Sequence, residues 1–118
     1  MYLFIDTNES RFAFFQEKES FAQLQWNNVE QEQSLSREIK AKHTHFKGIL
    51  VLQGKGGFSQ TREGIVFANI FNQTKQIPIL AISEEDTESK SLDQLVVQLK
   101  EEGNKPLMPH YFAEANIS

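Results

Sequence analysis

A continuous apolar segment that runs into a glycine-rich loop constrains the fold of this chain more than any other feature. Residues 48–52 read Gly-Ile-Leu-Val-Leu, a pattern typical of a central parallel strand that is covered on both faces. Residues 54–57 read Gly-Lys-Gly-Gly, and a helix-prone stretch over 58–75 follows, which Pro78 cannot extend. The order of strand, glycine loop and helix predicts an α/β fold with residues 48–52 at the centre of the sheet.

Three segments before this strand predict an antiparallel meander. Residues 2–5 form a short apolar run that ends at Asp6, and residues 11–15 are rich in phenylalanine. Residues 20–26 alternate apolar and polar side chains, as a half-exposed strand would. Because the polar breaks between these segments have the length of hairpin loops, we expect three antiparallel strands, followed by a polar helix over 29–42.

Two further elements are predicted beyond the long helix. Residues 77–82 indicate a fifth strand, and residues 83–90 an acidic connector exposed to solvent. The last helix has the clearest signals, because Ser91 is a candidate N-cap with Gln94 three residues on, and Gly103 would stop the helix. Its apolar stripe at helical spacing consists of Leu92, Leu95, Val96 and Leu99.

Length and composition place these elements in a single domain over 1–118. This length is near the usual size of one domain, and residues 106–118 are apolar enough for us to expect a docked tail. The absence of cysteine excludes disulfides and thiolate zinc sites, and the net charge of −4 provides no positive field for nucleic acid. The N-terminal apolar run reaches Asp6 too early for a signal peptide or a membrane span. We therefore expect a soluble cytoplasmic protein with no membrane contact.

The glycine loop and the start of the next helix carry a family resemblance. Residues 54–64 read Gly-Lys-Gly-Gly-Phe-Ser-Gln-Thr-Arg-Glu-Gly and resemble the Gly-Pro-Gly-Ser-Phe-Thr-Gly-Leu-Arg-Ile-Gly signature of the TsaB (YeaZ) family. Ser59 stands where the family has threonine, while Lys55 and Glu63 depart from a proline and an apolar residue. Identical residues fall at Gly54, Gly56, Phe58, Arg62 and Gly64.

Other segments are similar to the same family. Residues 77–83, Ile-Pro-Ile-Leu-Ala-Ile-Ser, resemble its Ile-Pro-Leu-Val-Gly-Val-Ser, and residues 109–114 resemble its closing Pro-x-Tyr-Leu-Arg segment. Residues 4–7, Phe-Ile-Asp-Thr, are similar to the strand end that the actin-like ATPase superfamily uses near phosphate. The resemblance spans nearly the whole first lobe of a two-lobed family, and one lobe alone is not expected to close a nucleotide cleft.

The resemblance implies a fold, a role and partners. The fold would be a single RNase H-like (actin-like ATPase) lobe: a three-stranded antiparallel meander continued by parallel strands, with helices packed on the mixed sheet. The role would be that of a non-catalytic subunit for a TsaD-like enzyme that makes threonylcarbamoyladenosine on tRNA. TsaB-like proteins pair with TsaD or with themselves through helices of the first lobe, so a TsaD-like partner or a homodimer is expected, and tRNA only indirectly. The alternatives are a small phosphate- or nucleotide-binding protein and a homodimeric structural module.

Two interpretations of the strand ends stay open. Glycines let the backbone approach an anion, and the helix N-terminus after the loop presents free N–H groups. The candidate anion- or nucleotide-binding residues are therefore Asp6, Thr7, Gly54, Lys55, Gly56, Gly57 and Ser59. The simpler interpretation is a tight turn at the glycines and a turn-forming aspartate whose side chain bonds its own backbone. Neither a dinucleotide-binding nor a Walker pattern is completed.

Candidates for metal binding and catalysis are weak. His43 and His45 lie two residues apart in a polar stretch without an obvious third ligand. His110 has no serine or cysteine partner that the sequence identifies. We therefore expect no metal, no cofactor and no catalytic residue, and a chain that is inactive by itself.

The helix over 58–75 is apolar on nearly all sides. Helical spacing separates three pairs of residues on it: Ile65 and Ala68, Val66 and Ile70, and Phe67 and Phe71. Since one sheet contact needs only one such stripe, the surplus favours a protein interface, unless the last helix and the tail cover it. The candidate interface residues are Phe58, Arg62, Gly64, Phe67, Ile70 and Phe71.

Overall fold

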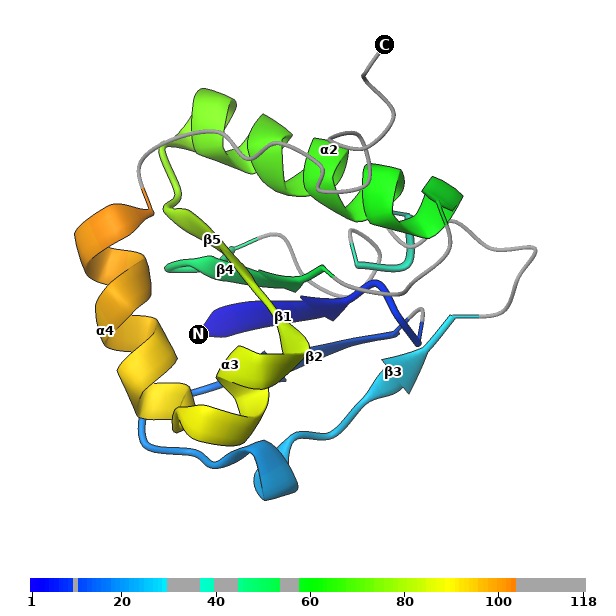
Figure 1. Cartoon of the computed structure of the whole chain (residues 1–118). Helices are drawn as coiled ribbons and strands as arrows, with labels where there is room; N and C mark the ends of the chain where they lie inside the picture. The colour runs from blue at the N-terminus through cyan, green and yellow to red at the C-terminus, as the bar shows by residue number, and fades with distance from the viewer. Residues whose placement is uncertain (10, 30–36, 40–44, 54–57, 104–118) are drawn as a thin grey trace, which may run out of the picture.

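The computed structural model describes residues 1–9, 11–29, 37–39, 45–53 and 58–103, with the backbone alone for residues 58–64, 67 and 71. Figure 1 shows a sheet between helices. The elements in chain order are β1 (Tyr2–Asp6), β2 (Arg11–Phe15), the 3-10 helix η1 (Phe21–Gln23), β3 (Asn27–Asn28), β4 (Ile49–Leu52), α2 (Phe58–Lys75), β5 (Ile79–Ile82), α3 (Glu84–Ser89) and α4 (Leu92–Glu102). Residues 37–39 are also helical, within the helix predicted over 29–42.

The five strands form one mixed sheet in the order β3-β2-β1-β4-β5. Strands β1, β2 and β3 pair antiparallel as the predicted meander, and β4 continues the sheet parallel to β1, with β5 parallel to β4. Every residue of β1 and of β4 is buried, which is why both strands read as continuous apolar runs. The predicted α/β class is therefore confirmed, whereas the centre of the sheet is β1 and the predicted central strand, β4, is an interior strand between β1 and β5.

Each face of the sheet has its own core, because side chains alternate along a strand. Helix α2 covers one face, where Ile65 and Ala68 pack with Leu3, Ile5 and Val51. Helix α4 covers the opposite face (Figure 1), in a core that includes Tyr2, Phe4, Leu50, Leu92, Leu95, Val96 and Leu99. The predicted stripe of the last helix is thus buried at all four positions.

The third strand differs from its prediction. Residues 20–26 do not form a strand, and β3 is confined to Asn27 and Asn28. Instead, the Ser20 backbone N–H donates to Gln23 Oε1 at 2.7 Å, and the Gln23 N–H donates to the Ser20 carbonyl at 3.0 Å. This local turn satisfies the backbone without a neighbouring strand, so an alternating pattern produces η1 in place of a sheet edge.

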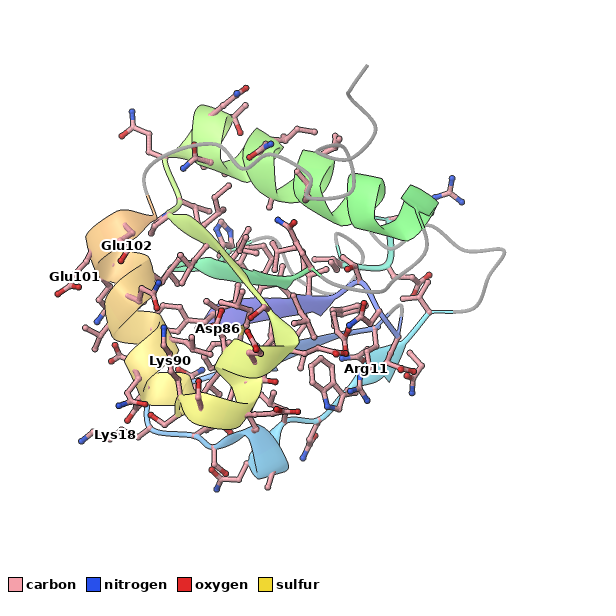
Figure 2. The ribbon with its side chains drawn as sticks, in the orientation of Figure 1. Arg11, Lys18, Asp86, Lys90, Glu101 and Glu102 are labelled. Carbon is pink, nitrogen blue, oxygen red and sulfur yellow. The ribbon has the colours of Figure 1, made fainter. Side chains whose placement is uncertain are left out.

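The acidic connector over 83–90 is also corrected, since it contains the short helix α3. Ser83 Oγ accepts from the Asp86 N–H at 3.2 Å, and Asp86 Oδ2 accepts from the Ser83 N–H at 2.9 Å. The hydrogen bond from the Ser83 backbone N–H lowers the pKa of Asp86 most, and the charge of Lys90 lowers it further. Figure 2 shows Asp86 on this helix and Lys90 just after its end, with 3.6 Å between Lys90 Nζ and Asp86 Oδ1. No residue of α3 is buried, so the expected exposure to solvent holds.

The predicted caps and boundaries of the other elements agree closely. Ser91 Oγ accepts from the Gln94 N–H at 3.1 Å, and Gln94 Oε1 accepts from the Ser91 N–H at 2.8 Å, forming the expected capping box. Helix α2 spans 58–75 as predicted, while β5 begins two residues later than the predicted fifth strand, at Ile79. The predicted docked tail lies outside the described residues.

Candidate functional site

The carboxyl ends of the parallel strands lie side by side. Leu52, at the end of β4, pairs with Asp6 of β1 on one side and with Ile82 of β5 on the other. Open α/β sheets bind their ligands outside this edge, which makes it a candidate binding site. Residues 54–57, the predicted anion loop, follow directly from it but lie outside the described residues, as does the side chain of Ser59.

Asp6 is a turn-forming aspartate. The residue is buried, with 2% of its surface exposed, and its Oδ1 accepts from the backbone N–H groups of Asn8 at 3.0 Å and Glu9 at 3.3 Å. Its Oδ2 accepts from Arg11 Nε at 2.9 Å. Both carboxylate oxygens therefore have donors from within the chain, as the simpler interpretation expects.

Thr7 joins the ends of β1 and β4. Its buried hydroxyl donates to the Leu52 carbonyl at 2.7 Å, and its backbone N–H donates to the same oxygen at 3.3 Å. The hydroxyl has one hydrogen and has used it, so this geometry leaves it no donor for an anion. Asp6 and Thr7 thus shape the strand ends, and the prediction of anion binding stays with residues 54–57 and Ser59.

A cavity of about 280 Å³ lies beside Asp6 on the α4 face of the sheet. The Arg11 guanidinium lies 4.1 Å from the centre of the Trp26 ring, in a cation–π contact. Phe4 packs edge-on against Trp26 and Phe21, with ring centres 5.3 Å and 6.0 Å apart. The cavity is lined by Phe4, Asp6, Arg11, Phe21, Trp26, Leu52 and Thr87.

Arg11 and Trp26 were not singled out as site residues from the sequence. Arg11 on β2 pairs with Asp6 across the β1–β2 hairpin and with Asn28 on the edge strand β3. Figure 2 labels Arg11 beside this strand. The sequence signal for Arg11 was the opposite charge of Asp6 on the other side of a hairpin turn. This signal identifies a contact only when the pairing register of the two strands is known. The cavity therefore has aromatic walls and one ion pair, Asp6 with Arg11. Because the negative charge of Asp6 offsets the positive charge of Arg11, this ion pair gives the cavity little attraction for an anion.

Metal ligands do not cluster in the part of the chain that the structure describes. Within these ranges no group of three or more histidine, cysteine, aspartate or glutamate side chains is placed to hold an ion. His43 and His110 lie outside the described residues. The described helices also include none with the length and apolar character needed to cross a membrane.

The outward side of α2 carries a pair of exposed apolar residues. Ile65 and Ala68 are buried against the sheet, whereas Val66 is 51% and Ile70 is 47% exposed. Because Val66 and Ile70 are four residues apart, they lie next to each other on one side of the helix, which we call the α2 outer face. The prediction that Ile65 and Ala68 lie on a different side of the helix from Val66 and Ile70 is therefore confirmed.

Comparable exposure of a large apolar residue recurs once among the described side chains, at Val97 of α4, which is 54% exposed. The predicted interface residues Phe58, Arg62, Gly64, Phe67 and Phe71 belong to α2, but their side chains lie outside the description. The α2 outer face is therefore defined by Val66 and Ile70.

Comparisons of the chain with protein-family models, with curated proteins and with solved structures found no match.

Proposed function

We propose that this chain is a non-catalytic, TsaB-like partner subunit that binds a TsaD-like enzyme in the synthesis of threonylcarbamoyladenosine on tRNA. The observation that carries the proposal is the α2 outer face, where Val66 and Ile70 expose about half of their surface. The resemblance implies pairing through first-lobe helices, and α2 is the helix that begins within the resembling segment. Contact with tRNA would be indirect, through the partner.

The sheet topology supports an RNase H-like lobe as the scaffold for this role. The order β3-β2-β1-β4-β5 combines an antiparallel meander with two parallel strands, as the resemblance implies. The crossover from β4 to β5 contains α2, which places this helix on one face of the sheet with its other side available to a partner.

The surroundings of Asp6 favour a binding role over an enzymatic one. A carboxylate that positions a metal-bound water needs an oxygen free to coordinate, and three donors already occupy the Asp6 oxygens. A metal ion at this carboxylate would also have to compete with the positive charge of Arg11 beside Oδ2. The alternative of a nucleotide-binding protein built around Asp6 is accordingly less favoured.

The composition of the α2 outer face suits a protein contact. Burying a Val or Ile side chain stabilises a complex by roughly 1.5–3 kcal/mol when burial is complete, and about half of each remains to be buried. The neighbouring Gln73 and Thr74 are exposed and polar, as residues at the rim of an interface are. Phe67 and Phe71 are the aromatic anchors that we expect beside this pair.

The test is co-elution with the TsaD-like enzyme from the same source. We expect the full chain to form a complex and Ile70→Asp to lose it while its circular dichroism spectrum is unchanged, because a carboxylate cannot be buried unpaired at a contact. Val97→Asp on α4 is the matched control and should bind normally. Failure of the unmodified chain to bind, or equal binding by both variants, would contradict the proposal. Light scattering of the chain alone distinguishes a homodimer through the same face.

A further inference from the structure

The cavity beside Asp6, which we call the Arg11–Trp26 cavity, is built from segments that lie far apart in the sequence. Its walls come from β1, β2, the end of β4, η1 and α3, and η1 and α3 lie at the same end of the sheet (Figure 1). Phe4 is buried, whereas Phe21 and Trp26 are only partly buried against the core of this face. The cavity therefore presents aromatic surface that a ligand could cover.

The volume of this cavity limits the size of a ligand. It is about 280 Å³. An apolar cavity of about 150 Å³ holds benzene, and sites for drug-sized ligands begin near about 300 Å³. The Arg11–Trp26 cavity therefore suits a molecule with one ring and a small substituent.

The three aromatic side chains of the cavity favour a flat ring. The Phe4 ring lies at 77° to the Trp26 ring and at 73° to the Phe21 ring, so both contacts are edge-to-face. Aromatic rings gain from such contacts beyond the area that they bury, because the positive edge of one ring meets the negative face of another. A planar aromatic ligand can add further contacts of this kind, which a compact aliphatic molecule cannot.

Arg11 supplies hydrogen-bond donors at the wall of the cavity. Its Nε–H donates to Asp6 Oδ2 at 2.9 Å, and its guanidinium lies 4.1 Å from the centre of the Trp26 ring. Its Nη1 and Nη2 groups form no hydrogen bond with a described residue, although each carries N–H donors. The contacts with Asp6 and Trp26 hold the guanidinium in place, so these donors suit a ligand that carries a carbonyl oxygen.

Thr87 of α3 supplies an acceptor at the same cavity. Its hydroxyl donates to the Glu84 carbonyl at 2.6 Å, so its hydrogen is used, but its oxygen can still accept. A ligand with both a carbonyl oxygen and an N–H group would satisfy Arg11 and Thr87 together. A carboxamide has both groups.

We propose that the Arg11–Trp26 cavity binds a small, neutral, aromatic carboxamide. The ring would lie among Phe4, Phe21 and Trp26, the carbonyl oxygen would accept from Arg11, and the amide N–H would donate to Thr87 Oγ1. The ligand is neutral because Asp6 already offsets the charge of Arg11, and a carboxylate would lose its hydration without gaining a free positive charge.

Three probes of matched shape test this assignment on the unmodified full-length chain. Trp26 is the only tryptophan, so its indole N–H gives a single signal in a ¹⁵N-labelled sample and reports directly on the cavity by NMR. Benzamide should shift this signal to saturation. Benzoate, which exchanges the amide for a negative charge, and toluene, which lacks an acceptor, should each bind about tenfold more weakly. A shift with benzamide that is absent or does not saturate would overturn the proposal, and so would equal or tighter binding of benzoate or toluene.

Substitutions then locate the binding site. Arg11→Lys keeps a positive charge beside Asp6 but removes the planar set of donors, so the affinity for benzamide should fall by about tenfold. Phe21→Ala should lower it by roughly three- to tenfold through the loss of one aromatic wall. Phe14→Ala is the matched control, since Phe14 is also partly buried but packs against the core of the α2 face, and it should bind benzamide normally. Unchanged affinity in Arg11→Lys and Phe21→Ala would place the ligand elsewhere and overturn the proposal.

This binding is independent of the proposed function. The cavity lies on the α4 face, away from the α2 outer face, and none of these titrations contains a TsaD-like enzyme. Failure of the chain to bind such an enzyme would leave the binding of benzamide intact, and loss of the binding of benzamide would leave the complex intact.

Discussion

The role of Asp6 illustrates how one side chain can be assigned from its partners. A carboxylate at the end of a parallel strand suits either a catalytic metal or a turn. The donors favour the turn, because two backbone N–H groups bind Oδ1 and the Arg11 guanidinium binds Oδ2. Asp6 was identified from the sequence as a candidate site residue. The contact between Trp26 and Arg11 was not, because it forms only after the chain has turned through η1.

A pair of substitutions at Asp6 separates its hydrogen bonds. Asp6→Ala should lower the free energy of unfolding by about 1.5–3 kcal/mol, because it leaves two backbone donors and Arg11 without their acceptor. Asp6→Asn keeps an oxygen for the turn and should lose less. Urea denaturation measures both. Equal losses would show that the turn hydrogen bonds contribute nothing, and a Mg²⁺-dependent stabilisation abolished in both variants would favour the metal interpretation.

At the scale of elements, local signals predicted the structure where they were unambiguous. The buried runs of β1 and β4 and the capping box of α4 are encoded within a few neighbouring residues, and each was identified. Helix α3 was missed because it has no apolar stripe, although Ser83 and Asp86 have the spacing of a capping box. The strand prediction for residues 20–26 was wrong, because alternating apolar and polar side chains occur in capped turns as well as in strands.

Helix α4 gives the clearest stability prediction. Leu95 is fully buried between the helix and the sheet, so Leu95→Ala should lower the free energy of unfolding by about 2–5 kcal/mol. Val97 lies on the exposed side of the same helix, and Val97→Ala should change the free energy of unfolding by no more than about 0.5 kcal/mol. Chemical denaturation of both variants checks the contrast. An unchanged midpoint for Leu95→Ala would show that α4 is not docked.

At the scale of the whole molecule, contacts distant in sequence close the α4 face. Lys100 Nζ of α4 lies 2.7 Å from Glu17 Oε2 in the segment after β2, and Tyr2 OH donates to the same oxygen at 3.1 Å. Nearby, the Lys18 N–H donates to Asp93 Oδ1 at 2.8 Å. Such contacts could not be predicted from the sequence, because they require the positions of both the first hairpin and the last helix.

The Glu17–Lys100 contact makes stability depend on pH at both ends of the scale. The hydrogen bond from Lys100 lowers the pKa of Glu17, and the bond to Glu17 raises the pKa of Lys100. A lowered carboxylate pKa contributes stability above the ordinary glutamate value of about 4.3, and this is lost as the pH falls through the folded-state pKa. A raised lysine pKa contributes stability below about 10.4, and this is lost as the pH rises through the folded-state pKa.

Two matched substitutions test this contact by NMR titration. Lys100→Gln should raise the pKa of Glu17 toward its ordinary value, because it removes the hydrogen bond that lowers this pKa most, and it should leave the pKa of Asp86 unchanged. Lys90→Gln should leave Glu17 unchanged and raise the pKa of Asp86 only in part, because the backbone hydrogen bond from Ser83 remains. If both variants shift both carboxylates alike, general screening of charge explains the shifts better than these contacts do. If Glu17 keeps its lowered pKa in Lys100→Gln, the last helix is not held to the first hairpin through this ion pair.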